Sequence, residues 1–287
     1  MSNPDPAPSP SSIRRTTIES PAGRLAALEA RPTDSTPVQG TAVFVPGFNG
    51  SKEDAISLLP PIVSMGYCVV SYDQRGQYES DGPTQARAYS IETFMNDLQT
   101  VVAVAGESQP VHLVGHSFGG LVARYMAITA PQSVKSLALL DSGPDGASLL
   151  HPCLPFFLSW LIRIGGLRAM AEVKHREARR SGVAADRLPW LRHRTLQTKR
   201  GNLIAICRAL ASEPDRLDEL LAKAIPLIVI CGEDDYIWSA ETQAKMAEDL
   251  AARLKVIMNA GHNPNDEQPQ ATADALLEFW ASVDGRC

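Results

Sequence analysis

The sequence predicts an α/β fold with a mostly parallel sheet of about eight strands, flanked by helices and interrupted by a helical cap. Short apolar, β-branched segments alternate with longer segments of helical periodicity, which is typical of a parallel sheet covered on both faces. This alternation stops after residue 144 and resumes at residue 224. A chain of 287 residues with 44% hydrophobic residues is long enough for one large domain that carries an insertion.

The strands are predicted from short apolar runs bounded by turn residues. Several of these runs are apolar at consecutive positions, as expected when helices cover both faces of a sheet. The expected strands of the parallel part are residues 41–47, 67–73, 111–115, 136–141, 226–232 and 254–260. Ahead of them, residues 13–20 and 23–30 flank the turn residues Pro21, Ala22 and Gly23 and predict a leading antiparallel hairpin.

The helices are predicted between these strands from the spacing of apolar residues. Residues 90–105 place apolar side chains on one helical face, at Ile91, Phe94, Leu98, Val101 and Val102. The other expected helices are residues 52–64, 118–129, 239–252 and 269–282. These elements assign residues 13–144 and 224–287 to the core domain and residues 145–223 to the helical cap.

The two least sheet-like segments are the N-terminus and the apolar part of the cap. Residues 1–12 are rich in Pro and Ser and lack the basic and apolar regions of a signal peptide, so we expect a flexible tail. Residues 153–167 are strongly apolar but are interrupted by Pro155 and Arg163. We interpret this stretch as too short to span a bilayer and expect no integral membrane segment.

Charge and cysteine content restrict the partners. A net charge of −5 gives no reason to expect nucleic acid. Between Arg163 and Arg208, twelve Lys and Arg residues stand against three acids. This basic cap could bind an anionic substrate, an acyl-carrier protein or a membrane surface. The favoured interpretation is that it is only a solvated helical face. Five cysteines without paired spacing indicate neither zinc nor a disulfide framework, and predict a cytoplasmic location.

The segment Gly115-His116-Ser117-Phe118-Gly119 lies between a predicted strand and a predicted helix. A serine on so tight a turn needs residues without side chains two positions before and after it. The turn exposes the hydroxyl at the carboxyl end of the sheet, beside free N–H groups of a helix N-terminus. A serine that only capped the helix would not need both glycines. We therefore predict that Ser117 is a nucleophile.

A nucleophilic serine needs a base, and the base needs a carboxylate to orient it. Of six histidines, His262 is the best candidate because it follows the last strand, at the edge where Ser117 emerges. For the acid, we favour Asp235, the third residue after Gly232, and Asp234 and Asp141 remain alternatives.

Two further groups complete the predicted site. The backbone N–H groups of Phe48 and Phe118 are expected to form the oxyanion hole, because one follows the first core strand and the other follows Ser117. In the cap, Phe156 and Trp160 are candidates for an apolar wall around the substrate. The alternative is that these aromatic side chains only pack the cap onto the core.

The order Ser117, Asp235, His262, together with the interrupted sheet, resembles the α/β-hydrolase fold family. GHSFGG resembles the nucleophile elbow of that family, GEDD its acid loop and AGHNP its histidine loop. YDQRGQYES resembles the Asp-x-Arg-Gly segment of capped members, which implies that Asp73 and Arg75 fix a loop near the site. The family usually has His-Gly before the oxyanion residue, whereas this chain has Pro46-Gly47.

The resemblance implies a serine hydrolase that cleaves an ester, lactone, thioester or amide of a small to medium, largely apolar molecule. The reaction would proceed through an acyl-enzyme and would need no metal or organic cofactor. The serine argues against the haloalkane dehalogenase and epoxide hydrolase branches, which use aspartate. Two alternatives remain: an acyltransferase or cofactor-free perhydrolase with the same triad, and a non-catalytic ligand-binding protein on the same scaffold.

Overall fold

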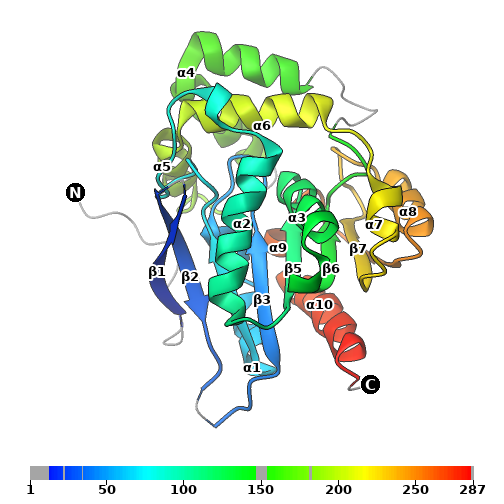
Figure 1. Ribbon diagram of the computed structural model, residues 1–287. Helices are drawn as coiled ribbons and strands as arrows, with labels where there is room; N and C mark the ends of the chain where they lie inside the picture. The colour runs from blue at the N-terminus through cyan, green and yellow to red at the C-terminus, as the bar shows by residue number, and fades with distance from the viewer. Residues whose placement is uncertain (1–12, 22, 34, 147–153, 181–182, 286–287) are drawn as a thin grey trace.

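Eight strands form a single sheet in the order β1-β2-β4-β3-β5-β6-β7-β8 (Figure 1). The structure is a computed structural model that describes residues 13–21, 23–33, 35–146, 154–180 and 183–285. β1 pairs antiparallel with β2, as does β2 with β4, and all other pairs are parallel. The strands are β1 (Ile13–Ser20), β2 (Gly23–Ala30), β3 (Gly40–Val45), β4 (Tyr67–Tyr72), β5 (Val111–His116), β6 (Val134–Leu140), β7 (Leu227–Gly232) and β8 (Arg253–Ile257). The predicted fold class is confirmed, and the predicted tail, residues 1–12, lies outside the described residues.

Helices cover both faces of this sheet and extend over one end of it. The α-helices are α1 (Leu59–Ser64), α2 (Ile91–Gly106), α3 (Phe118–Thr129), α4 (Leu154–Arg180), α5 (Leu188–Gln197), α6 (Arg200–Ser212), α7 (Leu217–Leu221), α8 (Ala240–Asp249), α9 (Pro264–Glu267) and α10 (Pro269–Val283). Short 3₁₀ turns are η1 (Lys52–Ala55), η2 (Ala86–Ala88) and η3 (Pro131–Ser133). The helix expected over residues 52–64 is instead split into η1 and α1. Pro60 and Pro61 lie in the first turn of α1, where a missing N–H costs no helical hydrogen bond.

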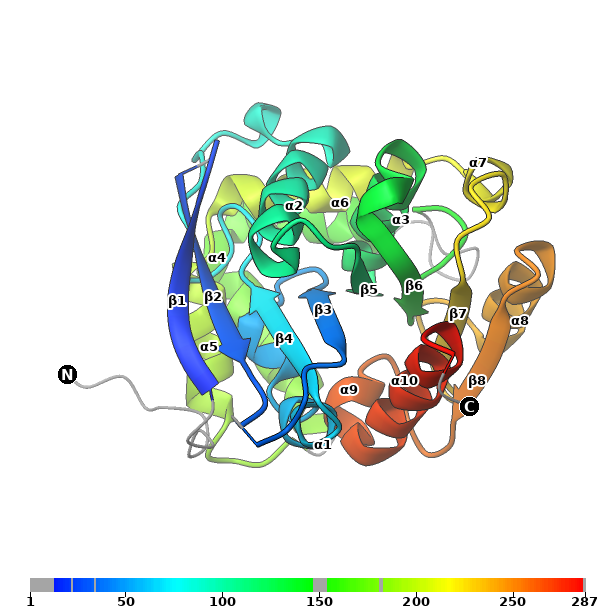
Figure 2. The ribbon, with the colours of Figure 1, turned by 60° about the horizontal axis from the view of Figure 1, so that its bottom comes forward.

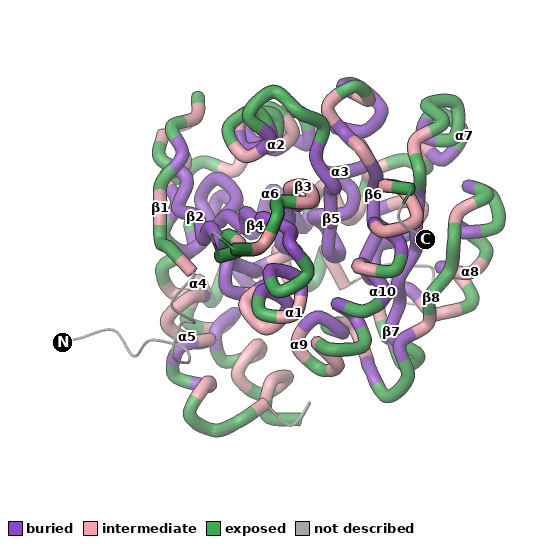
Figure 3. The backbone as a smooth tube through the Cα atoms, turned by 90° about the horizontal axis from the view of Figure 1, so that it is seen from below, coloured by how far each residue is buried: buried purple, intermediate pink, exposed green. Residues whose placement is uncertain are grey.

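The sheet separates two apolar layers. Because side chains alternate along a strand, Val43 and Val45 of β3 join the core under α2 and α3, and Ala42 and Phe44 join the core with α1 and α10. Figure 2 shows the sheet between these two sets of helices, and Figure 3 shows that its central strands are buried. Burial on both faces explains the consecutive apolar residues in the strands.

The cap consists of α4, α5 and α6, which lie across the carboxyl ends of the central strands (Figure 1). The backbone N–H of Gly146 donates to the carbonyl of Glu213 over 2.9 Å, so the two ends of the cap segment meet. α7 belongs to the core, since Leu217 and Leu220 pack in the layer that contains α3. Side chains also join cap to core, because Asn49 donates to the Thr195 hydroxyl over 3.0 Å.

Of the apolar stretch 153–167, expected to be too short for a membrane span, residues 154–167 belong to α4, which has 27 residues and a non-helical residue at Gly166. Within the part of the chain that the structure describes, α4 is the one helix long and apolar enough to cross a membrane, with a mean hydropathy of 1.2 over 18 residues. Only 17% of those residues are buried inside the protein. α4 meets this criterion by length and composition only, and the expectation that no segment spans a membrane stays a prediction.

Candidate active site

Ser117 lies at a strained corner between β5 and α3. Its φ of 54° and ψ of −123° are unusual for a residue with a side chain. A methyl group on Gly119 would lie 2.1 Å from the carbonyl oxygen of Val45, and one on Gly115 would lie 2.5 Å from the Cα of Gly120. The corner therefore requires glycine on both sides of Ser117, as its sequence pattern predicts.

The structure brings Ser117, His262 and Asp235 together in one hydrogen-bonded chain. His262 Nε2 lies 3.0 Å from Ser117 Oγ, and His262 Nδ1 lies 3.0 Å from Asp235 Oδ1. These distances fit a neutral imidazole that accepts from the serine hydroxyl and donates to the carboxylate. Burial alone would raise the pKa of Asp235, but the hydrogen bond from His262, the positive charge of that ring when it is protonated, and the Ile237 N–H hold this pKa below its usual value.

The alternative acids occupy different environments. Asp234 is exposed, whereas Asp141 is buried and accepts from the backbone N–H of Gly232 over 2.8 Å. Burial and the adjacent charge of Asp235 raise the pKa of Asp141 well above its usual value, which favours the neutral acid. Asp141, Asp235 and His262 form a cluster of metal-ligand type. However, both ring nitrogens of His262 are engaged in the hydrogen-bonded chain, so the cluster is better described as part of that chain.

Two side chains that sequence reasoning missed support His262 and Asp235. Gln243 of α8 donates to Asp235 Oδ2 over 2.9 Å and also to the Trp238 carbonyl. His116 contacts the histidine loop, because its Nε2 is 2.8 Å from the carbonyl oxygen of His262. Burial and the neighbouring His262 lower the pKa of His116 to about 3, so its ring is neutral. No sequence spacing links these residues to their partners.

The loop after β3 passes close to the serine. A methyl group on Gly47 would lie 3.0 Å from Ser117 Cβ. Two buried side chains fix this loop: Gln74 donates to the Pro46 carbonyl over 2.7 Å, and Gln77 donates to the Gly47 carbonyl over 2.8 Å. In a trans peptide the N–H points opposite to the carbonyl, so the bond from Gln77 also fixes the direction of the Phe48 N–H.

The second predicted oxyanion donor belongs to Phe118, the first residue of α3. N–H groups in the first turn of a helix have no intrahelical partner, so that of Phe118 is available to a ligand. Asp73 and Arg75 have the structural role expected for them. Asp73 accepts from the Lys52 ammonium over 3.0 Å, and Arg75 bonds Asp97 over 2.6 Å.

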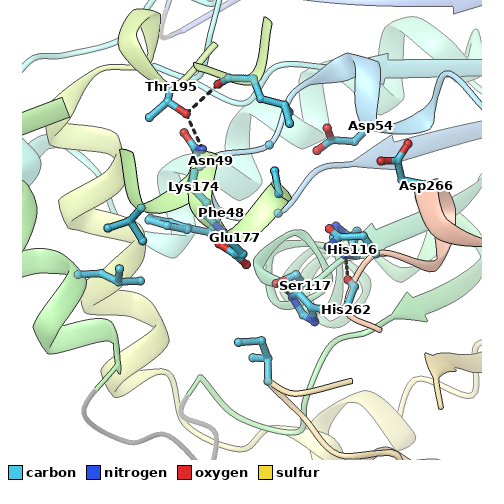
Figure 4. A pocket seen from close by; sticks show the side chains of 18 of the residues that line it. Phe48, Asn49, Asp54, His116, Ser117, Lys174, Glu177, Thr195, His262 and Asp266 are labelled. Carbon is cyan, nitrogen blue, oxygen red and sulfur yellow. Dashed lines mark hydrogen bonds and ion pairs between the residues drawn. The ribbon is translucent and has the colours of Figure 1, made fainter. Parts of the chain in front are cut away.

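A cavity of about 360 Å³ opens above Ser117 and His262, between the core and the cap (Figure 4). The inner face of α4 contributes Leu154, Leu158 and Met170 to the apolar part of its wall, and other apolar lining residues, such as Phe48, Leu210 and Trp238, come from other elements. Phe156 and Trp160, predicted for this wall, do not line the cavity and are 65% and 55% exposed. Side chains two positions from Leu154 or Leu158 point to the opposite side of a helix, which is why the prediction fails.

Among the described residues, the polar part of the cavity wall carries no unpaired cation. Three of its cations come from the cap, and each is paired with a carboxylate. The pairs are Lys174–Glu177 at 2.8 Å, Arg187–Asp266 at 2.6 Å and Arg194–Asp54 at 2.6 Å. These pairs leave the wall without an excess positive charge that would favour an anionic substrate.

Comparison with known proteins identifies the family. The model of the alpha/beta hydrolase family matches residues 42–275. The chain belongs to the alpha/beta hydrolase family. A non-heme chloroperoxidase of Streptomyces lividans is 29% identical to this chain, and the match covers 88% of this chain and 94% of that protein.

A further relative of this hydrolase, and a solved structure with the same fold, bear names of hydrolytic enzymes. The 2-hydroxy-6-oxononadienedioate/2-hydroxy-6-oxononatrienedioate hydrolase of Paraburkholderia xenovorans is 26% identical, over 77% of this chain and 78% of that one. A thermophilic esterase from Thermogutta terrifontis superposes with a TM-score of 0.77 at 23% identity, covering 94% of this chain and 99% of the esterase. The protein is therefore a hydrolase-type enzyme of this family.

Proposed function

We propose that the protein is a serine hydrolase that cleaves an acyl bond of a small to medium, largely apolar and uncharged substrate. The observation that carries this proposal is the chain from Ser117 Oγ through His262 to Asp235, with both links at 3.0 Å, at a cavity between the core and the cap. This is the arrangement that a serine needs for nucleophilic attack. The bond type includes carboxylic esters, lactones, thioesters and amides.

Each residue has a defined step in this mechanism. His262 takes the proton of Ser117 as Oγ attacks the acyl carbonyl, and Asp235 stabilises the imidazolium that forms. The N–H groups of Phe48 and Phe118 donate to the oxyanion of the tetrahedral intermediate. His262 then protonates the leaving group, and an acyl-enzyme remains on Ser117. Water deprotonated by His262 releases the acid and regenerates the serine.

The test is labelling with a fluorophosphonate, which forms a bond to an activated serine with loss of fluoride. We expect one adduct per chain on Ser117 and at least a 100-fold lower labelling rate for Ser117→Ala and His262→Ala. Ser142→Ala is the matched control, because Ser142 is also buried at the end of a neighbouring strand. Stoichiometric labelling of Ser117→Ala, or an unlabelled wild type that is folded, would refute the proposal.

The substrate size is tested with p-nitrophenyl esters of increasing acyl length. A cavity of about 360 Å³ is at the small end of ligand sites, so we expect kcat/KM to be greatest for short to medium chains. Leu158→Trp, which adds volume to the inner face of α4, should shift this optimum to shorter chains. An optimum at long chains that Leu158→Trp does not change would refute the assigned cavity.

A second candidate uses the same acyl-enzyme with another acceptor. The match to a non-heme chloroperoxidase over 88% of this chain favours hydrogen peroxide as that acceptor. Attack of the peroxide on the acyl carbonyl would release Ser117 and a peracid. Product analysis with water and hydrogen peroxide in competition distinguishes the two functions, because only the perhydrolase gives peracid in preference to acid.

A further inference from the structure

The outer face of the first half of α4 carries an apolar ridge made of Phe156, Phe157, Trp160 and Ile164. Phe157 and Ile164 are 52% and 70% exposed. Phe156 and Trp160 are the two exposed residues that, as described above, do not line the cavity. At 100° per residue, the four side chains occupy an arc of about 100°. Ile162, on the opposite side, is fully buried. The ridge is therefore exposed to solvent, and α4 is the outermost helix over α6 in Figure 1.

The composition of the apolar ridge is that of a membrane interface. The rings of Phe157 and Trp160 stack with centroids 6.2 Å apart, so they present one continuous surface. Large aromatic side chains are favoured at the boundary between lipid headgroups and acyl chains. Contiguous exposed apolar surfaces on soluble proteins mark sites of interaction. The cavity does not use the ridge, because α4 lines it with the opposite face.

Positive charge adjoins the apolar ridge at Arg163 and Arg200, and exposed cations outnumber exposed acids over the described cap. Arg163 lies on α4 at the edge of the arc, and the Arg200 guanidinium donates to the Arg163 carbonyl. The exposed cations of the cap are Arg163, Arg168, Arg176, Arg179, Arg180, Arg192, Lys199, Arg200 and Arg208. Among the described cap residues from Arg163 to Arg208, the exposed acids are Glu172 and Asp186. This charge is complementary to an anionic surface.

We propose that the apolar ridge, with Arg163 and Arg200, docks the protein on an anionic lipid bilayer, with α4 lying in the plane of the interface. Aromatic and aliphatic side chains would enter the headgroup region, and the arginines would contact lipid phosphates.

The structure favours a helix that lies on the membrane over one that spans it. α4 is long enough to span, but it contains Arg163 within its apolar part. It is also kinked at Gly166, where φ is 67° and ψ is −164°. Its inner face packs against α6 through Ile162 and Met170, both fully buried. Insertion across a bilayer would break this packing, whereas docking of the outer face preserves it.

Docking would also place the cavity close to the lipid. Leu154 and Leu158 line the cavity from the same helix whose outer face would touch the membrane. The two faces are separated by one helix diameter, about 10 Å. A lipid-soluble substrate would therefore have a short path to Ser117. This consequence rests on the proposed function, but the docking itself does not.

The full-length protein is tested with vesicles of phosphatidylcholine alone and with one quarter phosphatidylglycerol, at low and physiological salt. Trp160 is a natural probe, because the other three tryptophans, Trp190, Trp238 and Trp280, are buried. We expect a blue shift of the emission and quenching by brominated lipids with anionic vesicles, both weakened by salt. Failure of the wild type to bind anionic vesicles at low salt would overturn the proposal.

Matched variants separate the apolar and charged contributions by co-sedimentation. Phe156→Ser with Trp160→Ser should lower vesicle affinity at least tenfold. Met65→Ser with Met258→Ser, two similarly exposed residues of the core, should change it less than twofold. Unchanged binding of the ridge variant, with an unfolding temperature like that of the wild type, would overturn the proposal.

Arg163→Glu with Arg200→Glu should lower the affinity about fivefold or more per arginine at low salt, whereas Lys255→Glu on the core should not. Binding lost in the arginine variant but kept in the ridge variant would overturn ridge docking in favour of purely electrostatic binding to the anionic vesicles. A wild-type dimer that the ridge variant converts to monomer would overturn it in favour of a second copy. Ser117→Ala should bind vesicles like the wild type, so failure of the proposed function leaves this result unaffected.

Discussion

The buried imidazole of His116 makes the folded protein sensitive to acid. In the fold its pKa is lowered to about 3 by burial and by His262, whereas an unfolded histidine has a pKa of about 6.5. Between these values the unfolded chain binds a proton that the folded chain does not, so stability falls as the pH decreases. The stability is fully present above pH 6.5, and the loss is complete only below pH 3.

The size of this effect follows from the two pKa values. At 1.36 kcal/mol per pKa unit, the difference between the folded and unfolded pKa values corresponds to about 5 kcal/mol of free energy of unfolding. About 2 kcal/mol of this is lost between pH 7 and pH 5. At pH 5 the folded ring is still neutral, so this part depends almost wholly on the unfolded chain. His116→Gln keeps an amide that can donate to the His262 carbonyl and removes the titration.

The assay is urea unfolding of the wild type and His116→Gln at pH 7 and pH 5. Other ionisable groups contribute to both proteins, so their effect cancels in the difference between the two pH dependences. The wild type should lose about 2 kcal/mol more free energy of unfolding than the variant over this interval. Parallel losses in the two proteins would show that His116 titrates in the folded state, and would refute the reasoning.

Three other substitutions test the groups around the site. Gln77→Leu should lower kcat by up to about 100-fold with little change in KM, because the peptide that carries the Phe48 N–H loses its hydrogen bond from Gln77. An unchanged kcat, measured with a p-nitrophenyl ester, would contradict this role. Asp141→Asn should gain stability over the wild type as the pH rises from about 4 towards 7, because over this interval the unfolded wild type releases the Asp141 proton while the folded protein keeps it; urea midpoints at both pH values check the sign. Gly119→Ala should lower the free energy of unfolding by at least about 1–3 kcal/mol and abolish most fluorophosphonate labelling, because the added methyl group clashes with the Val45 carbonyl. A stable, fully labelled variant would contradict that contact.

The sequence predicts those parts of the fold that depend on local patterns. The hairpin of β1 and β2 has the predicted bounds, because Gly23, with a φ of 107°, allows the turn that the pattern indicates. The corner at Ser117 is likewise local, since its glycines are needed within two residues. The residue that accepts from His262 was harder to choose, because several carboxylates follow strands at the same sheet edge. The hydrogen bond to Asp235 agrees with the favoured choice, and its catalytic role stays a prediction.

Tertiary contacts explain what the sequence did not predict. Gln243 reaches Asp235 from a different helix, and no periodicity in the chain records that contact. The α4 helix is apolar on two faces, so composition alone could not tell which face lines the cavity. Phe156 and Trp160 are the larger side chains, but Leu158 is the one that faces inward. Helix orientation depends on packing against α6, which is known only from the fold.

The hydrogen bond between Gly146 and Glu213 has a consequence for how this enzyme can be altered. The segment that leads into the cap and the segment that leads out of it lie side by side. The chain of the cap is therefore joined to the core at a single place. Arg124 reinforces this attachment, because its guanidinium donates to the carbonyls of Pro144 and Pro214 on the two sides. A segment cut at these two points can be exchanged for one of different length without moving β6 or β7. Substrate range can thus diversify by recombination at a single pair of junctions, while the chemistry below stays fixed.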